Sequence, residues 1–307
     1  MRILAVGAGG VGGYFGGRLL HVGRDVTFLV RPARSTLLAK SGLRIRSPHG
    51  DLGLPAVPTV TADAIASVYD LVLLSCKAYD LESAMNDVAP AVGPGTTILP
   101  LLNGMRHLDI LDARFGAERV LGGECKISAV LDAEGCVLHL NRVHQISFGE
   151  RDGTGSARTL ALQEAFANAN FDAVFSAQIL QEMWEKWTLI ATGAGATCLM
   201  RGTIGDIVAA NATEIVTGLL DECSAIATAN GHPPSDAMRS WIHSIFTAPN
   251  SSLTASMFRD IEANARIEGE HIIGDLLARG GDGSYPLLRM VHAHLRSYEA
   301  RRARQLA

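Results

Sequence analysis

The chain has 307 residues, which is long enough for two domains that each bury a core of their own. Its formal net charge of -4 at pH 7 argues against nucleic acid as a partner. Although 48% of the residues are hydrophobic, no apolar run reaches the ~18 residues that a membrane-spanning helix needs, and the start MRILAVGAGG runs into glycines instead of a cleavage site. We therefore expect a soluble cytoplasmic protein without a membrane partner.

Neither the cysteines nor the histidines are spaced as metal ligands. The five cysteines are odd in number and never form CxxC, which argues against a disulfide framework and against a zinc site. No HExxH or comparable pattern accompanies the ten histidines. The sequence therefore predicts no metal.

The first 30 residues predict a strand, a helix and a second strand. RILAVG is a short apolar run, GAGGVGGYFGGRLL is a glycine turn that opens into a helix, and DVTFLV is a second apolar run rich in β-branched residues. Two further runs, DLVLLSC and TTILPLL, end at polar residues and lead towards helix-like segments, as strands of a parallel sheet do. The stretch from 119 to 149 alternates and contains the turn signal DAEG, which predicts antiparallel strands.

From about residue 156 onward the apolar pattern has a helical period, with FDAVFS as one last candidate strand. The pattern predicts an α/β domain over residues 1–172, followed by an all-helical domain over residues 173–307. A ligand is expected in the cleft between the two domains.

The glycine turn predicts a dinucleotide site. Gly7, Gly9 and Gly12 form GxGxxG directly after a strand: the first allows a tight turn, the second lets the backbone approach a pyrophosphate, and the third allows close helix packing. Gly10 belongs to the same predicted cofactor-binding turn. A purely structural glycine turn is the alternative, but the position between two strands favours the dinucleotide.

The end of the second predicted strand indicates which dinucleotide. An NAD site usually has an acidic residue there, whereas this chain reads FLVRPAR with Arg31 and Arg34. A guanidinium can hold a 2′-phosphate through paired hydrogen bonds, so NADP(H) is the predicted cofactor. Ordinary surface arginines are the alternative, which is more credible for Arg34 than for Arg31.

Lys186 lies between two tryptophans in EMWEKWTLIATG, with its stem on a mostly apolar helical stripe. Only positions 40, 77, 126 and 186 are lysine, so arginine is the usual cation of this chain. Either Lys186 extends its ammonium group to solvent, or it lies in a dry cleft where burial can lower the pKa of a lysine.

Lys77 in SCKAYD and Asn103 in LLNGM follow the later predicted strands, where open α/β sheets bind ligands. An exposed lysine and an ordinary Asn-Gly turn are the alternatives.

The ordered set GAGGVGG, LVRPAR, SCKAYD, LLNGM, ISFGE, WEKW, SMFRDI and IEGEH resembles the ketopantoate reductase (2-dehydropantoate 2-reductase) family over nearly the whole chain. That family has an amino-terminal Rossmann-type dinucleotide-binding domain, an all-helical carboxy-terminal domain and an NADPH site. The resemblance implies hydride transfer from NADPH to the ketone of a 2-oxo acid, with ketopantoate as the leading substrate. Helical second domains of this kind often pair, which leaves a homodimer open.

The resemblance also implies roles for single residues. It makes Lys186 the proton donor, Asn103 a nicotinamide-side and substrate-binding residue, and Ser256 and Glu268 substrate-binding residues, with Glu268 counted among the catalytic pair. The cofactor phosphates would be contacted by Arg31 and Lys77. For Glu268 the alternative is an ordinary solvated helix glutamate.

Two departures from the family pattern bear on the substrate. The family's helix usually continues KxxxNxxxN, whereas this chain has Ile190 and Ala194 at those positions, and GGECKIS places Glu124 and Lys126 near the expected cofactor. Loss of two amides would leave polar groups of a substrate unpaired, at about 1–3 kcal/mol each. A reductase of a less polar ketone, a non-catalytic NADP(H)-binding regulator and a β-hydroxy acid dehydrogenase are therefore the alternatives.

Overall fold

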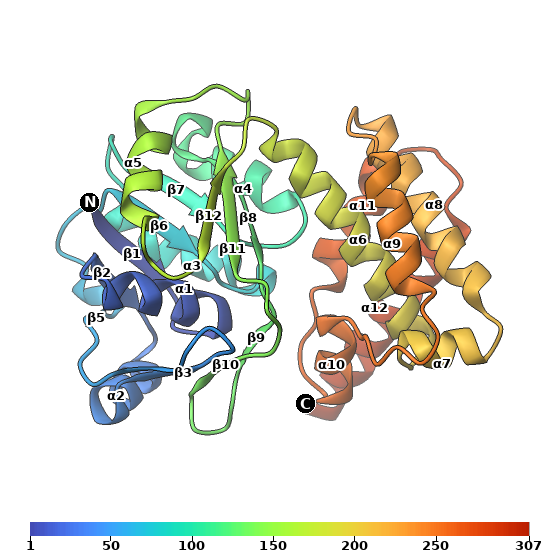
Figure 1. Cartoon of the computed structure of the whole chain (residues 1–307), viewed down its shortest axis with the longest axis horizontal. Helices are drawn as coiled ribbons and strands as arrows, with labels where there is room; N and C mark the ends of the chain where they lie inside the picture. Colours follow the sequence, from blue (N-terminus) through green and yellow to red (C-terminus); the bar gives the residue numbers. More distant parts are fainter. Residues whose placement is uncertain (307) are drawn as a thin grey trace. The chain divides into compact units, whose positions relative to one another are not determined.

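The computed structural model describes residues 1–306, and its chain forms two compact units (Figure 1). The first contains Met1–Leu102 and His107–Ile179, and the second contains Asn103–Arg106 and the chain from Leu180 onward. The sequence places the domain boundary between residues 172 and 173. In the structure the boundary along the chain lies seven residues later, between Ile179 and Leu180. The reason is that the strand Asp172–Phe175 pairs with a strand of the first unit.

The first unit is built on a parallel sheet, which confirms the predicted fold class. Its five strands are, in spatial order, β5 (Thr59–Val60), β2 (Asp25–Leu29), β1 (Arg2–Val6), β6 (Leu71–Leu74) and β7 (Thr97–Pro100). The main connecting helices are α1 (Gly10–His21), α2 (Pro32–Ser41) and α3 (Leu81–Val88), with 3-10 turns at Ala62–Ala64, Ala78–Asp80 and Ala89–Ala91. The chain leaves β1 in one direction to form β2 and later returns to its other side as β6. The carboxyl end of β1 is therefore a topological switch point, where such sheets bind ligands.

Two smaller sheets complete the first unit. One has the order β4 (Leu52–Leu54), β3 (Leu43–Arg46), β10 (Val137–His139), β9 (Ala129–Leu131), and the other has the order β12 (Asp172–Phe175), β11 (Gln145–Gly149), β8 (Gly122–Lys126). The helices α4 (Arg106–Phe115) and α5 (Ala157–Phe166) and the 3-10 turn Ala117–Arg119 belong to the same part of the chain. The alternating stretch from 119 to 149 does contain antiparallel strands, but β8 pairs with β11 and not with its neighbour β9.

The second unit is helical in all its described regular elements. These are α6 (Ile179–Met200), α7 (Ile204–Ala209), α8 (Thr213–Ala229), α9 (Asp236–Phe246), α10 (Ser256–Glu262), the π-helix η5 (Glu270–Gly274), α11 (Asp275–Arg279) and α12 (Pro286–Leu306). Over residues 1–306, no helix has both the length and the apolar character needed to cross a membrane.

Small residues allow α6 to be surrounded by other helices. A Cβ on Gly193 would lie 2.6 Å from the ring of Phe246 on α9, and one on Gly195 would lie 3.1 Å from Leu219 on α8. Residues 191–198 are buried as a result. The stretch GAGATC is thus a packing feature of the helix that also carries Lys186.

Gly193→Leu is expected to destabilise the protein by about 3 kcal/mol, because the new side chain has no room beside Phe246. Chemical denaturation followed by circular dichroism measures the change. Ala225→Leu, which adds the same side chain on the exposed face of α8, is the control and should unfold like the wild type. Equal stability of the two variants would contradict the close packing of α6.

Candidate active site

The turn after β1 has the conformation and the space that an anion-binding turn needs. Gly7 has a φ of +88°, which favours glycine, and its amide donates to the carbonyl of Leu29 at 2.9 Å. Gly9 is the N-cap of α1 without a side-chain hydrogen bond, and no described atom lies within 4 Å of a Cβ built on it. The first amides of a helix have no intrahelical acceptor and favour an anion. A dinucleotide pyrophosphate therefore fits this end of α1.

The other two glycines of the turn are required by packing. A Cβ on Gly12 would lie 2.2 Å from the carbonyl oxygen of Gly7 and 2.3 Å from Oγ of Ser75. One on Gly10 would lie 2.4 Å from the carbonyl oxygen of Ala129 on β9. Helix α1 thus packs directly against the backbone of the glycine turn and of β9. Such close packing is the reason for a glycine at the third position of the motif.

Arg31 and Lys77 lie at the carboxyl edge of the parallel sheet, after β2 and β6. The side chain of Arg31 is 72% exposed, and its Nη2 lies 3.2 Å from Oδ1 of Asp80. Lys77 is the N-cap of the 3-10 turn that contains Asp80, and its carbonyl accepts the Asp80 amide at 2.9 Å. Arg31 remains accessible to a phosphate, but Asp80 competes for it.

Arg34 has a different environment from Arg31. Its Nε and Nη2 donate to the carbonyl of Ala8 at 3.1 and 2.8 Å, and Nη2 also donates to the carbonyl of Gly135 at 3.1 Å. Burial lowers the pKa of the guanidinium, which nevertheless stays protonated at neutral pH. Arg34 therefore stabilises the glycine turn through the carbonyl of Ala8, a role that the sequence pattern did not indicate.

In the second unit the π-helix η5 connects two segments that carry predicted site residues. The indole Nε1 of Trp187 on α6 donates to the carbonyl of Ile272 at 2.9 Å, and Nε2 of His271 donates to the carbonyl of Asn103 at 2.7 Å. The Ile272 amide donates to the carbonyl of Glu268 at 2.9 Å. π-Helical turns often occur at functional sites because they free backbone groups for other contacts.

Lys186 and Glu268 are half-buried and lie next to these contacts in the chain. Lys186 precedes Trp187, and Glu268 lies two residues before η5. Burial lowers the pKa of His271 although the nearby charge of Glu268 opposes this, so the imidazole is neutral and its Nε2 carries the hydrogen for Asn103. Three predicted site residues are thus connected to η5: Asn103 and Glu268 through their carbonyls, and Lys186 through the neighbouring Trp187.

Trp187 and His271 are functional candidates that the sequence motifs do not single out. Trp187 is completely buried and His271 nearly so. Both residues belong to quoted motifs, since Trp187 is the second tryptophan of WEKW and His271 ends IEGEH. Only the fold shows that both donate to backbone carbonyls.

Ser256 lies further along the helical unit. It is exposed at the first residue of α10, and the amide of the preceding Ala255 donates to Oγ1 of Thr197 on α6 at 3.4 Å. Thr197 lies ~16 Å beyond Lys186 along the helix axis. The structure therefore does not place the start of α10 at the level of Lys186.

The two positions that depart from the family pattern differ in burial. Ile190 is half-buried, whereas Ala194 is 1% exposed and therefore part of the core. On β8, Glu124 is 2% exposed and Nζ of Lys126 lies 3.1 Å from its Oε1. This ion pair largely balances the two charges that the sequence adds near the expected cofactor.

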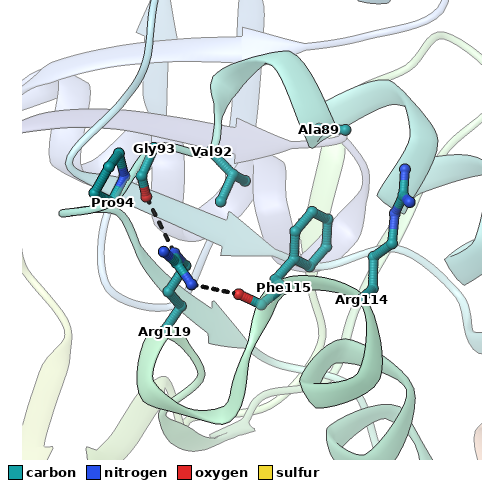
Figure 2. Close-up of a pocket in the computed structure, with 7 residues that line it drawn as sticks. All are labelled: Ala89, Val92, Gly93, Pro94, Arg114, Phe115 and Arg119. Atoms are coloured by element: carbon teal, nitrogen blue, oxygen red, sulfur yellow. Dashed lines mark hydrogen bonds between the residues drawn. The ribbon is translucent and has the colours of Figure 1, made fainter.

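One shallow pocket of the first unit is lined by none of these residues (Figure 2). Its lining contains Arg119, whose guanidinium donates to the carbonyls of Gly93 at 3.2 Å and Phe115 at 2.7 Å. Gly93 precedes β7, so the pocket adjoins the amino-terminal edge of the parallel sheet, opposite the glycine turn. It is not the dinucleotide site.

The parallel sheet and the glycine turn have the architecture of a Rossmann-type dinucleotide-binding domain, followed by a helical second domain. The family model described as ketopantoate reductase PanE/ApbA matches residues 3–153, and the model of its C-terminal part matches residues 178–299. The chain belongs to the ketopantoate reductase family.

Known proteins resemble the chain over its whole length. The uncharacterized oxidoreductase YkpB of Bacillus subtilis is 37% identical over 98% of this chain and 99% of its own. The crystal structure of 2-dehydropantoate 2-reductase from Geobacter metallireducens GS-15 has a TM-score of 0.88 and 29% identity, covering 97% of this chain and 99% of that one. D-mandelate dehydrogenase, in a ternary structure with NADH and anilino(oxo)acetate, shares the fold at a TM-score of 0.86 and 21% identity, covering 99% and 100%.

Proposed function

We propose that the protein is an NADPH-dependent reductase of 2-oxo acids, with 2-dehydropantoate as the leading substrate. The observation that carries the proposal is the double attachment to η5. Trp187, the residue after Lys186, attaches α6 to η5, His271 in η5 binds the carbonyl of Asn103, and Glu268 lies two residues before η5. Segments from three distant parts of the sequence are thereby joined at one short element, and a catalytic site requires such positioning of its residues.

The cofactor would be held by the glycine turn and the amino-terminal end of α1, with Arg31 and Lys77 at its phosphates. A bound NADPH supplies the hydride. Negative charge develops on the carbonyl oxygen of a ketone as it is reduced, and the ammonium group of Lys186 stabilises that charge and donates the proton. Glu268 accepts a hydrogen bond from a hydroxyl of the substrate, and the side chain of Asn103 orients the reacting end.

The substrate is the less constrained part of the proposal. The Geobacter protein is described as a 2-dehydropantoate 2-reductase, which supports that substrate. The apolar side chain of half-buried Ile190 supports a less polar ketone, and the shared fold of D-mandelate dehydrogenase illustrates that one architecture serves different oxo acids.

A substrate panel tests the reaction. NADPH oxidation should be followed by absorbance with 2-dehydropantoate, short aliphatic 2-oxo acids and an aromatic 2-oxo acid. The proposal expects turnover with at least one member, and preference for the aromatic acid would move the assignment to a less polar ketone. Tight NADPH binding without turnover of any oxo acid would instead favour a non-catalytic NADP(H)-binding regulator.

The choice of NADPH over NADH is expected to depend on Arg31. Arg31→Ala should weaken NADPH binding by about tenfold, the loss of a charge-assisted contact, and leave NADH binding unchanged. Calorimetric titration with both cofactors measures this. Arg44→Ala is the control, since it removes an exposed arginine of the same unit that pairs with Glu134 and follows neither β2 nor β6. Equal affinity of the wild type for the two cofactors would refute NADP(H) specificity.

A further inference from the structure

Three imidazole rings are stacked in the first unit, away from the residues of the proposed reaction. The rings of His49 and His144 have centroids 3.6 Å apart and are inclined by 16°, and the ring of His139 lies 5.8 Å from each of them. His49 also donates from Nε2 to the carbonyl of Arg142 at 2.7 Å. Within residues 1–306, no group of three or more His, Cys, Asp or Glu side chains has a geometry that could hold a metal ion.

Hydrogen bonds attach the stack to its surroundings. Nδ1 of His144 is bonded to the hydroxyl of Tyr14 at 2.7 Å, and Nδ1 of His139 to the hydroxyl of Ser47 at 3.0 Å. Nε2 of His139 lies 3.1 Å from the carbonyl of Val143. Because a carbonyl only accepts, that nitrogen carries the hydrogen, and neutral His139 accepts from Ser47.

The stack also determines the position of helix α1. Tyr14 is one turn beyond Gly10, where α1 begins, and Arg18 is one turn further on the same face. Arg18 is 3% exposed, donates from Nη2 to the carbonyl of Gly50 at 2.6 Å, and lies 5.2 Å above the Tyr14 ring. The helix whose amino-terminal end would hold the cofactor phosphates is thus attached to the imidazoles.

The environment favours neutral rings. Burial lowers the pKa of both His139 and His144, and Coulombic interactions with His49 and Arg18 lower them further, whereas the hydrogen bonds of His139 to Val143 and Asn141 act in the opposite direction. Asp172 on β12 acts in the opposite direction on His144. The charged or titratable groups around the stack are Tyr14 and Arg18 on α1, Asp51 after β3, Arg142 before β11 and Asp172 on β12.

We propose that the stack of His49, His139 and His144 is a proton-sensitive clasp that positions α1, so that acidification weakens dinucleotide binding. Two protonated rings at the separation of His49 and His144 would repel each other across a part-buried contact. The loops that carry them would then move apart and release Tyr14. The part of this inference that concerns the cofactor rests on the proposed function.

The direction of the pH effect follows from proton linkage. An unfolded histidine binds a proton with a pKa of about 6.5, whereas His139 and His144 bind it at lower pH in the fold. The unfolded chain therefore takes up more protons than the folded one as the pH falls below about 6.5. The contribution of the clasp to stability is complete above that pH and is lost below it.

The test compares His49→Gln, which removes one member of the close pair, with His243→Gln, which removes an exposed histidine of the second unit. Binding of acid-stable NADP+ is measured by calorimetry between about pH 7.5 and 5.5. The wild type and His243→Gln should bind about tenfold more weakly at the lower pH. Relative to its own affinity at the higher pH, His49→Gln should lose most of this decrease.

The Tyr14→Phe variant and the acid dependence of the Tm complete the test. The 2′-phosphate of NADP+ titrates near pH 6 equally for all variants, so only the difference between variants counts. Tyr14→Phe keeps the ring but removes the link to His144, and it should also reduce the pH dependence. The same pH dependence in the wild type, His49→Gln and Tyr14→Phe would overturn the clasp. If NADP+ binds at no pH, the proposed function fails, and the clasp is decided by whether acid lowers the Tm of the wild type more than that of His49→Gln.

Discussion

Lys186→Met is expected to lower kcat/KM for the best 2-oxo acid by about 100- to 10,000-fold, the range that a positioned general acid contributes. The half-buried methionine fills a similar volume on α6, so NADPH affinity and Tm should stay close to those of the wild type. Steady-state kinetics and calorimetric titration measure the two effects separately.

Two controls separate charge from proton donation. Lys40→Met removes an exposed lysine of α2 and should leave the kinetics unchanged. Lys186→Arg keeps a positive charge, but a guanidinium has too high a pKa to donate its proton. It should therefore remain slow. Undiminished turnover by Lys186→Met would remove this residue from the mechanism.

Gly9→Ala and Gly12→Ala are expected to fail in different ways. A methyl group on Gly12 would meet the carbonyl oxygen of Gly7 at 2.2 Å, so this variant should lose about 1–3 kcal/mol of stability and most of its dinucleotide binding. A methyl group on Gly9 would meet no described atom within 4 Å, so Gly9→Ala should fold normally but bind at least about tenfold more weakly, because the pyrophosphate needs that space.

Thermal unfolding and calorimetric titration with NADPH distinguish the two variants. Gly95→Ala is the control in the same unit, since a Cβ there also meets no described atom and the glycine has no positive φ. Wild-type affinity of Gly9→Ala would show that the phosphates do not approach this turn, and wild-type stability of Gly12→Ala would contradict the close packing of α1.

Much of the fold could be predicted from the sequence because its signals are local. Apolar runs of strand length, separated by glycines and turn residues, predict the βαβ unit around GxGxxG, and the helical period after residue 156 predicts the second unit. Pairing partners are not local. For this reason the alternating stretch from 119 to 149 predicted strands correctly but did not show that β8 pairs with β11, and the boundary at residue 172 cut through β12.

The same distinction applies to the site. Local chemistry is sufficient to single out Lys186 as a rare lysine on an apolar stripe and the glycines as a phosphate-binding turn. The attachment of Asn103 to His271 joins residues 168 positions apart. The guanidinium of Arg34 is bonded to Ala8, at the glycine turn, because β1 and β2 are parallel neighbours whose carboxyl ends lie side by side. Hydrogen-bond partners depend on which segments lie together. Residue types and their spacing therefore determine the fold class and the candidate chemistry of this protein. Only the packing of distant segments decides which side chains are available for that chemistry and which, like Arg34, are used in hydrogen bonds that stabilise the fold.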